Sequence, residues 1–431
     1  MTRVNSPVDK VRHLQRQLYL AAKRSRTRRF HALYDRIARP DVLRRAWEQV
    51  RRNRGAAGID AETIADVEAY GVEQMLGELR AQLVTHRYRP QPVRRVYIPK
   101  ADGRRQRPLG IPRVRDRVLQ TALKLVIEPV FEASFRECSY GFRPQRSARQ
   151  AVTAIRKWVN YGYCEVVEVD IANFFDSVDH ELLLGLLARR ISDRRVLKLI
   201  RQLLRAGVLE EGTVRPTVAG VPQGGVVSPV LANVYLHAFD ALFETEAGKL
   251  GHLVRYADDL VICCETQAAA VAAHAWVVRT LRRLRLTAHP EKTRVVSLTG
   301  GHAGFDFLGF HFRYLRGWHD PSRWAVRNWP DRQAMRQVRA RIKAVTGPAW
   351  KRHRSIEDIV AEVNPILRGW TAYFRMPGTA RQMAQIDQYV IRRLALFQKK
   401  KHGWRALGWR HYTPAWQRAV GLSTCAGTPS A

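Results

Sequence analysis

Hydrophobic positions in the first third of the chain recur at helical spacing. Four of them precede a basic run at residues 23–29 and predict a first helix: Val11, Leu14, Leu18 and Leu20. The segment DVLRRAWEQV predicts a second helix with Asp41 as its N-cap, and residues 61–83 a third. Between these two, the glycines and basic residues of RRNRGAAGID are typical of a loop close to phosphate. Residues 114–131 predict a further helix.

Between the helices at 61–83 and 114–131, the pattern changes to one typical of strands. Val93, Val96 and Ile98 predict one strand, and the segment RPLGIPR predicts another. The turn-type segment ADGRR separates the two. Residues 90–112 are therefore predicted to form a β-hairpin.

Two further strand patterns lead into acidic residues. The buried-type run EVVEV ends at Asp170, and apolar runs on both sides of YADD predict a β-hairpin with Asp258 and Asp259 at its tip. Neighbouring carboxylates repel one another, and a bound metal offsets that repulsion. Transfer of nucleotide phosphates uses carboxylates that hold two divalent metals about 3.5–4 Å apart. Taken alone, the doubled Asp is weak evidence for catalysis and is more typical of an ordinary polar turn, since Asp is a favoured turn residue.

A glycine-containing element, GVPQGGVVSPVLANVYLHAFD, lies between these acids. Its glycines at 220, 224 and 225 allow the backbone to approach a ligand closely. Ser228 and Pro229 predict the N-cap and first residue of a helix. That helix is expected to bury a stripe made of Leu231, Val234, Tyr235 and Leu242.

Charge is distributed unevenly along a chain whose formal net charge is +36. Residues 1–54 carry sixteen basic and four acidic side chains, residues 55–312 thirty-five and twenty-eight, and residues 313–411 twenty-two and six. A nearly balanced middle is thus flanked by two basic arms, which favours binding to a polyanion such as nucleic acid. Aromatics among these charges can stack on bases or simply fill a core. Eight of the eleven tryptophans follow residue 317: Trp318, Trp324, Trp329, Trp350, Trp370, Trp404, Trp409 and Trp416.

The composition also excludes some classes of protein. Five scattered cysteines, without a CxxC pair, argue against a disulfide framework and a structural zinc site; Cys263 and Cys264 are expected in the core. No apolar run approaches the roughly 20 residues of a membrane-spanning helix. The N-terminus lacks the apolar stretch of a secretory signal. We therefore expect a soluble, cytoplasmic protein.

Seven motifs follow one another over roughly residues 90–312: YIPKADGRRQRPLGIPRVRDRVLQ, SYGFRPQRSARQAV, VDIANFFDSVDH, GVPQGGVVSPVLANVYLHAFD, RYADDLVI, LTAHPEKTRVV and FLGFHF. Their order resembles that of reverse transcriptases, most closely those encoded by group II introns. The later segment IVAEVNPILRGWTAYFR resembles the start of the maturase segment of that family, which binds intron RNA.

The resemblance implies roles for individual residues. Asp170, Asp258 and Asp259 match the catalytic carboxylates that bind metal. The nucleotide-binding residues that it implies are Lys100, Arg107, Phe175, Gln223 and Lys292.

Among these nucleotide-binding residues, Phe175 matches the aromatic that blocks a ribose 2′-hydroxyl, and Lys100 and Arg107 match the pair that grips the triphosphate. Gln223 matches the residue lying against nucleotide and template, and Lys292 the basic residue of the sixth motif. Without the family, Lys100 and Arg107 would be interpreted as solvated charges, and Phe175 as a core aromatic like Phe174.

The implied fold is an α+β right-hand polymerase with a palm built on an antiparallel sheet. Residues 1–89 are expected to form a basic N-terminal extension and the start of the fingers, and residues 90–312 the fingers and palm. Residues 313–411 are expected to form a helical thumb and maturase RNA-binding domain, and residues 412–431 a short tail.

The implied activity is that of an RNA-directed DNA polymerase that also binds its group II intron RNA, assists splicing and copies that RNA into cDNA. Its substrates would be an RNA template with a DNA or RNA primer and deoxynucleotide triphosphates, with a two-metal site for Mg²⁺, although Mn²⁺ also remains open. The sequence does not identify the intron or the oligomeric state. Because few residues follow Tyr412 and no cysteines are paired, we expect no zinc-bearing endonuclease domain and no cleavage of target DNA.

Three alternatives stay open at this point. A reverse transcriptase of another prokaryotic type, CRISPR-associated or defence-related, would share the core motifs but not the maturase-like arm. An RNA-binding splicing cofactor without polymerase activity would not need the intact YADD. A basic structural RNA-binding protein fits the charge but leaves the acidic hairpin unexplained.

Overall fold

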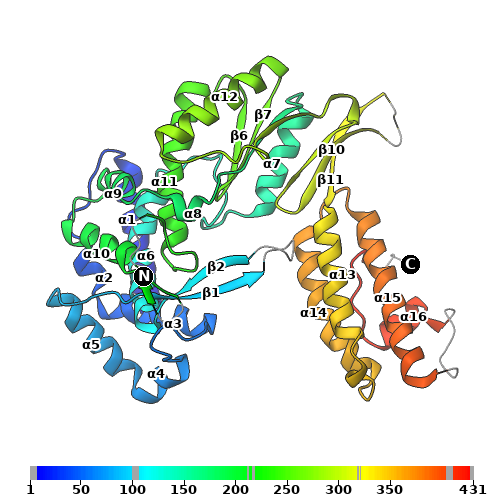
Figure 1. Cartoon of the computed structure of the whole chain (residues 1–431), viewed down its shortest axis with the longest axis horizontal. Helices are drawn as coiled ribbons and strands as arrows, with labels where there is room; N and C mark the ends of the chain where they lie inside the picture. Colours follow the sequence, from blue (N-terminus) through cyan, green and yellow to red (C-terminus); the bar gives the residue numbers. More distant parts are fainter. Residues whose placement is uncertain are drawn as a thin grey trace, which may run out of the picture. The chain divides into compact units, whose positions relative to one another are not determined.

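The computed structural model describes residues 7–99, 106–210, 213–215, 219–317, 320, 322–403 and 411–427. Their helices and strands, labelled in Figure 1, make this a mixed α/β protein. The chain forms two compact units, one of residues 1–151 and 167–295, the other of residues 152–166 and 296–431.

The first unit contains most of the helices before residue 296. They are α1 (Pro7–Arg24), α2 (Tyr34–Ile37), α3 (Pro40–Asn53), α4 (Ile64–Tyr70), α5 (Val72–Val84), α6 (Val114–Glu132), α8 (Phe174–Ser177), α9 (His180–Ala188), α10 (Arg194–Arg205), α11 (Ser228–Leu242) with a π-helical extension at Phe243–Ala247, and α12 (Gln267–Arg283). Helix α7 (Ala148–Asn160) begins in this unit and continues in the other.

Two four-stranded sheets are formed by strands from the part of the chain up to residue 297. One has the order β2 (Gln106–Ile111), β1 (Val93–Pro99), β4 (Val208–Glu210) and β5 (Thr213–Arg215), with β1 antiparallel to β2 and parallel to β4. The other has the order β6 (His252–Tyr256), β7 (Asp259–Cys264), β3 (Glu165–Val169) and β8 (Arg294–Ser297). The predicted hairpin of β1 and β2 is thus confirmed.

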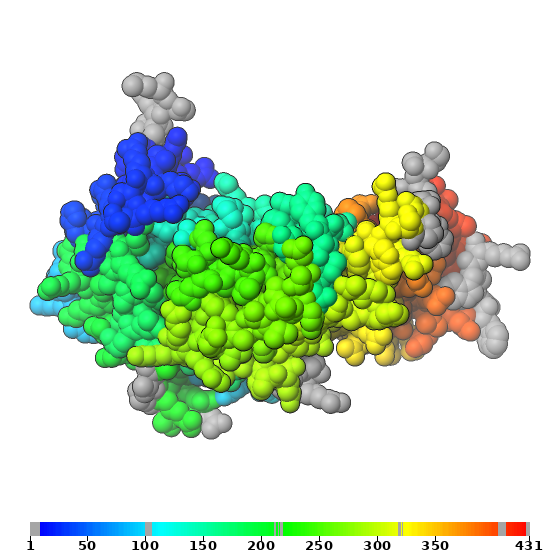
Figure 2. All heavy atoms as spheres, turned by 90° about the horizontal axis from the view of Figure 1, so that it is seen from above, coloured from blue at the N-terminus to red at the C-terminus, as the bar shows by residue number. Residues whose placement is uncertain are grey.

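Helix α6 forms the centre of the helical part of this unit. It is buried along most of its length and packs against α1 and α3, which lie close to it in Figure 1. Burial on all sides explains why its sequence is apolar well beyond one stripe. The N-terminal segment then continues along the surface, where Figure 2 shows it in blue beside the green of residues 180–200. Phe30 donates its backbone N–H to the carbonyl of Arg190 there, at 2.8 Å.

The second unit combines a small sheet with a helical bundle. The sheet has the order β11 (Trp324–Pro330), β10 (Phe310–Arg316) and β9 (Gly304–Phe307), and the helices are α13 (Arg332–Thr346), α14 (Ile356–Phe374), α15 (Ala380–His402) and α16 (Pro414–Ala419). Short 3₁₀ turns lie at Thr299–Gly301 and Ala349–Lys351. The expectation of a helical region from residue 313 was therefore wrong for residues 313–316 and 324–330, which lie in strands.

Several predicted helix boundaries need correction. Asp41 is not an N-cap, because Pro40 already occupies the first helical turn and Arg39 is the N-cap of α3. The single helix predicted at residues 61–83 is divided into α4 and α5 by Gly71, whose φ of +109° ends the first helix. Val227 is the N-cap of α11, so Ser228 lies inside the helix, and its hydroxyl donates instead to the carbonyl of Pro222 at 2.8 Å.

The predicted core stripes are largely confirmed. Val11, Leu14 and Leu18 are buried, but Leu20 is 40% exposed. In α11, Leu231, Val234 and Tyr235 are buried and Leu242 is only half-buried. Cys263 and Cys264 are buried, as expected for small core residues.

Candidate active site

The acidic hairpin is formed by β6 and β7, which pair in antiparallel register from His252↔Cys263 to Tyr256↔Asp259. Ala257 and Asp258 make the turn, and Ala257 adopts a left-handed backbone conformation with φ +58°. The apolar runs on both sides are buried, which fixes the register because a slip by one residue would move them to the opposite face. Asp258 and Asp259 are therefore held at the end of a buried hairpin, as predicted.

Asp170 directly follows β3, which lies beside β7 in the sheet. Its carbonyl accepts a hydrogen bond from the backbone N–H of His289 at 2.8 Å, which fixes its backbone. Its carboxylate forms an ion pair with Lys292, with 2.8 Å between Nζ and Oδ2. The structure thus brings Lys292, which the resemblance assigned to nucleotide binding, into direct contact with a predicted metal ligand.

Burial and neighbouring charges shift the pKa values of two of the three carboxylates, Asp258 and Asp259. Burial raises the pKa of Asp258, and Asp170 raises it further, whereas the charge of Arg107 lowers it. Burial, followed by the charges of Asp258 and Asp170, raises the pKa of Asp259 to about 7. Lys292 and Arg107 counteract that shift. The Asp259 side chain itself is exposed to solvent, at the start of the otherwise buried strand β7.

This donor set fits a divalent cation. Hard oxygen ligands are those that Mg²⁺ prefers, and a cation would offset the burial and the neighbouring negative charges that raise the pKa values of Asp258 and Asp259. Within the described residues, no three His, Cys, Asp or Glu side chains already converge as a metal-binding cluster. The ammonium group of Lys292 instead supplies the positive charge next to Asp170.

A buried ion pair behind the hairpin was not predicted. Arg255 on β6 is fully buried and donates to both carboxylate oxygens of Asp240 on α11, at 2.7 and 2.6 Å. It also donates to Oδ1 of Asn233 and to the carbonyl of Ala257, each at 3.0 Å. Arg255 therefore connects helix α11 to the turn that carries Asp258. In the sequence, the sign of this buried pair was the arginine within the otherwise apolar strand segment LVRY.

The other candidate residues lie around this centre in different ways. Phe175 is half-buried, and its ring meets the buried ring of Phe174 edge-on, with 5.3 Å between the centroids. Arg107 is exposed on β2, opposite Ile98. Its positive charge lowers the pKa values of Asp258 and Asp259. Gln223 is half-buried, and its backbone carbonyl accepts a hydrogen bond from the backbone N–H of Gly110 at 2.6 Å. Lys100 lies outside the described residues.

The glycine-containing element approaches the segment after β3 closely. Val221 donates its backbone N–H to the carbonyl of Phe175 at 2.6 Å. A Cβ on Gly220 would lie 2.9 Å from that carbonyl oxygen, and Gly220 has φ +93°. A larger residue could not occupy this position without moving one of the two segments.

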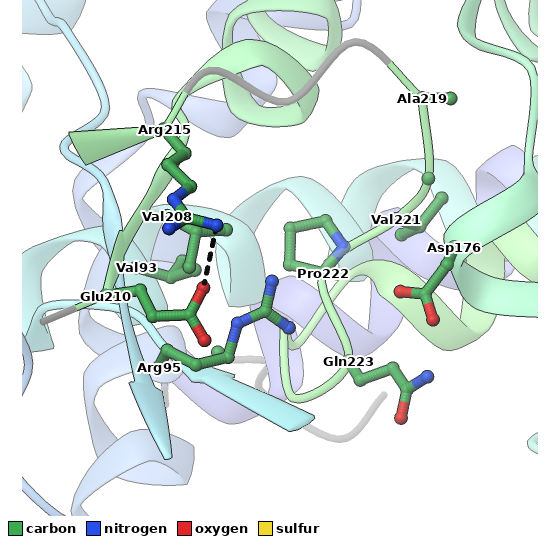
Figure 3. A pocket seen from close by; sticks show the side chains of 12 residues that line it. Val93, Arg95, Asp176, Val208, Glu210, Arg215, Ala219, Val221, Pro222 and Gln223 are labelled. Atoms are coloured by element: carbon green, nitrogen blue, oxygen red, sulfur yellow. Dashed lines mark ion pairs between the residues drawn. The ribbon is translucent and has the colours of Figure 1, made fainter. Parts of the chain in front are cut away.

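A cavity of about 300 Å³ lies beside this element, between β1, β4, β5 and the residues before α11. Figure 3 shows its labelled lining side chains, with Arg95 next to Glu210, Gln223 below Pro222 and Asp176 at the right of the view. Arg215 and Glu210 form an ion pair at 4.0 Å. Among the predicted site residues that the structure describes, Gln223 lines this cavity, whereas Asp170, Asp258 and Asp259 do not.

The tryptophans of the basic arm divide between core and surface. Trp370 is buried against Phe374, whereas Trp350 is 69% exposed beside Lys351, whose ammonium lies 5.3 Å from the centre of its ring. Trp318, Trp404 and Trp409 lie outside the described residues. In the described part of the chain, no helix combines the length and the apolar character needed to cross a membrane.

Comparisons with known proteins agree with this arrangement. A family model described as reverse transcriptase (RNA-dependent DNA polymerase) matches residues 98–312, and one described as group II intron, maturase-specific domain matches residues 335–416. Polymerases of this kind generally use divalent metal ions.

Three curated proteins illustrate the similarity. The group II intron-encoded protein LtrA of Lactococcus lactis subsp. cremoris is 40% identical over 212 residues, which is 49% of this chain and 35% of that protein. Protein YkfC of Escherichia coli is 38% identical over 237 residues, or 53% of this chain and 61% of that protein. Nuclear intron maturase 1, mitochondrial, of Arabidopsis thaliana is 36% identical over 95 residues, or 22% and 13%. The matches thus span 61% or less of the length of these relatives.

Proposed function

Because the chain belongs to the family of group II intron-encoded reverse transcriptases and maturases, we propose that it is an RNA-directed DNA polymerase. It extends a DNA or RNA primer on an RNA template by adding deoxynucleotides, with release of pyrophosphate. The observation that carries this proposal is the placement of Asp170 directly after β3 and of Asp258 and Asp259 at the end of the hairpin formed by β6 and the neighbouring strand β7.

In this proposal the three aspartates hold the divalent metals, with Mg²⁺ as the expected ion and Mn²⁺ as the alternative. Bound metal ions would promote ionisation of the attacking 3′-hydroxyl and stabilise charge on the leaving phosphate. The buried hairpin keeps Asp258 and Asp259 in place before substrates arrive, and such preorganisation reduces the cost of reaching the reactive geometry. Lys292 holds the carboxylate of Asp170 in place through their ion pair.

The remaining candidates would bind the nucleotide. Lys100 and Arg107 would hold the triphosphate, and the influence of Arg107 on Asp258 supports a position close to the reaction. Phe175 would exclude a ribose 2′-hydroxyl, and Gln223 would contact nucleotide and template. Lys292 would contribute its positive charge from its position next to Asp170.

We further propose the right-hand arrangement for this chain. Residues up to about 160 would form the fingers, with strands β1 and β2 at their tip, and the sheet of β6, β7, β3 and β8 would form the palm. Residues 313–411 would form the thumb and maturase region. Their excess of basic residues and the maturase-specific match support binding of the group II intron RNA, whose splicing the protein would assist and which it would copy into cDNA.

The test is primer extension on an RNA template with Mg²⁺ and deoxynucleotides, comparing wild type with Asp258→Ala. A matched control is Glu73→Ala, which removes an exposed acid paired with Arg44 on the first unit. We expect cDNA from wild type and from the control but not from Asp258→Ala, with RNA binding unchanged in all three. If wild type makes no cDNA while still binding RNA tightly, a splicing cofactor without polymerase activity becomes the better assignment.

A further inference from the structure

A segment at residues 139–145 lies directly against the acidic hairpin. Tyr140 donates its backbone N–H to the carbonyl of Arg255, and Arg255 donates its own to the carbonyl of Cys138, both at 2.8 Å. A Cβ on Gly141 would lie 2.3 Å from the backbone nitrogen of Ala257. The segment therefore touches the turn at Ala257–Asp258 backbone to backbone, with no room for a side chain between them.

Buried polar contacts hold this segment rigidly. Arg143 is buried, donates to both carboxylate oxygens of Glu132 at 3.0 and 2.7 Å, and donates to the carbonyl of Ser139 at 2.7 Å. Asn233 donates from Nδ2 to the carbonyl of Gly141 at 2.9 Å. Because the buried residues alternate with exposed ones, these anchors leave the side chain of Phe142 on the outside.

Phe142 combines two features that ordinary packing does not explain. Its side chain is 48% exposed, although it is a large apolar residue, and its backbone has φ +55°. Positive φ is strained for a bulky residue, whereas glycine or asparagine adopts it easily. Strained residues of this kind cluster at functional sites, where the surrounding contacts hold them in place.

The exposed ring lies on the face of the hairpin that carries Asp259. Its centroid is 6.3 Å from that of Tyr256, with 42° between the ring planes. Tyr256 and Asp259 are directly paired in the register of β6 and β7. Directly paired residues of an antiparallel hairpin point to the same face. Phe142 and Tyr256 thus form an aromatic surface next to the carboxylate of Asp259.

We propose that Phe142, together with Tyr256, is a stacking platform for the base of the 3′-terminal nucleotide of the primer. This inference rests on the proposed polymerase function, since the nucleotide whose 3′-hydroxyl reacts must lie at the aspartates. An aromatic surface holds any of the four bases, because every base has a π-face. The platform therefore positions the primer end without selecting its sequence, as copying of an arbitrary template requires.

The decisive variant is Phe142→Gly, because it removes the ring and also relieves the positive φ. If the ring served only to stabilise the fold, this variant would melt at a lower temperature. We expect its melting temperature to be unchanged or higher. We also expect its KM for primer–template to rise by about 5- to 100-fold, the range for loss of one base–aromatic stack. Phe142→Trp should keep a KM within about twofold of wild type, because a larger ring also stacks.

A control and a direct probe complete the experiment. Tyr70→Ala removes a similarly exposed aromatic (45% exposed) from α4 of the same unit and should leave KM unchanged. The probe is a DNA primer with 2-aminopurine at its 3′ end, annealed to an RNA template and bound without deoxynucleotides. Stacking on Phe142 should quench its fluorescence with wild type and with Phe142→Trp, but much less with Phe142→Gly.

Three results would overturn the proposal: an unchanged primer–template KM for Phe142→Gly, a rise confined to the KM for deoxynucleotides, or equal quenching by wild type and Phe142→Gly. A rise confined to the KM for deoxynucleotides would mean that the ring contacts the incoming nucleotide. Equal quenching would mean that the ring stacks on no base at all. Since the fluorescence experiment needs no catalysis, a wild type that quenches the probe but makes no cDNA would refute the polymerase function and leave the platform standing.

Discussion

Replacing Arg255 by methionine separates the two roles that its hydrogen bonds suggest. The guanidinium is 0% exposed and donates to Asp240, Asn233 and the carbonyl of Ala257. The Arg255→Met side chain fills much of the same volume but donates no hydrogen bond. The carboxylate of Asp240, itself 1% exposed, then remains buried without its cationic partner.

The expected cost follows from this burial. Removing one partner of a fully buried ion pair destabilises a protein by about 3–5 kcal/mol, because the remaining charge is neither solvated nor paired. For a unit of this size, such a loss lowers the melting temperature by roughly 6–20 °C. The double variant Arg255→Met/Asp240→Leu removes the stranded charge as well. Its stability should return to within about 1 kcal/mol of wild type, since apolar replacements of buried pairs are often neutral or better.

Activity should not return together with stability. In the double variant the carbonyl of Ala257 still lacks its donor, so the turn that carries Asp258 is held less tightly. Small displacements of catalytic groups can reduce rates by about 100-fold, and we expect primer extension to fall by about 10- to 100-fold in both variants. The assays are thermal unfolding for stability and primer extension at 25 °C, where the double variant is folded.

Two outcomes would refute this reasoning. A double variant with wild-type stability and full polymerase activity would mean that Arg255 serves only the core. A single variant that loses less than about 1 kcal/mol would mean that the pair is not electrostatically isolated from water, contrary to its burial.

Three further predictions follow from other parts of the molecule. Phe175→Val should increase incorporation of ribonucleotides relative to deoxynucleotides by about 10- to 100-fold, measured by primer extension with each nucleotide set; an unchanged ratio would assign Phe175 to the core. Neutralising Lys399, Lys400 and Lys401 should weaken RNA binding and reduce the slope of log K against log salt by about two to three, and an unchanged slope would argue against RNA contact there. Burial lowers the pKa of His237 to about 4, from an ordinary value of 6.5. The unfolded chain therefore binds more protons between these values, and stability should fall by about 1–3 kcal/mol as pH drops from 6.5 to 4. His237→Phe should remove that contribution, as urea unfolding at several pH values would reveal.

Elements with strong local patterns could be predicted from the sequence. The run EVVEV and the hairpin around YADD form as expected, because their apolar residues are contiguous and each turn is short. Helix α6 also agrees with the prediction to within a residue or two. In these cases burial and backbone preference favour the same structure.

Features that depend on contacts between distant residues could not be predicted. Strand β4 has three residues and pairs in parallel with β1, more than one hundred positions earlier in the chain. The pairing of Arg255 with Asp240 requires α11 to pack beneath β6, which no local pattern encodes. The break at Gly71 was missed because the apolar spacing continues across it; only the positive φ, visible in three dimensions, ends the helix.

The second unit is built from two separate stretches of the chain, and this affects how the protein can be divided into fragments. Residues 152–166 belong to the second unit although the rest of that unit begins at residue 296. Within it, Asn160 accepts the backbone N–H of Val326 at 2.9 Å, and Cys164 accepts that of Leu298 through its carbonyl at 2.9 Å. During translation, some 130 intervening residues must therefore be synthesised before this unit can fold. A recombinant piece that starts at residue 296 would lack these partners, whereas a fusion that joins residues 152–166 to it would supply them.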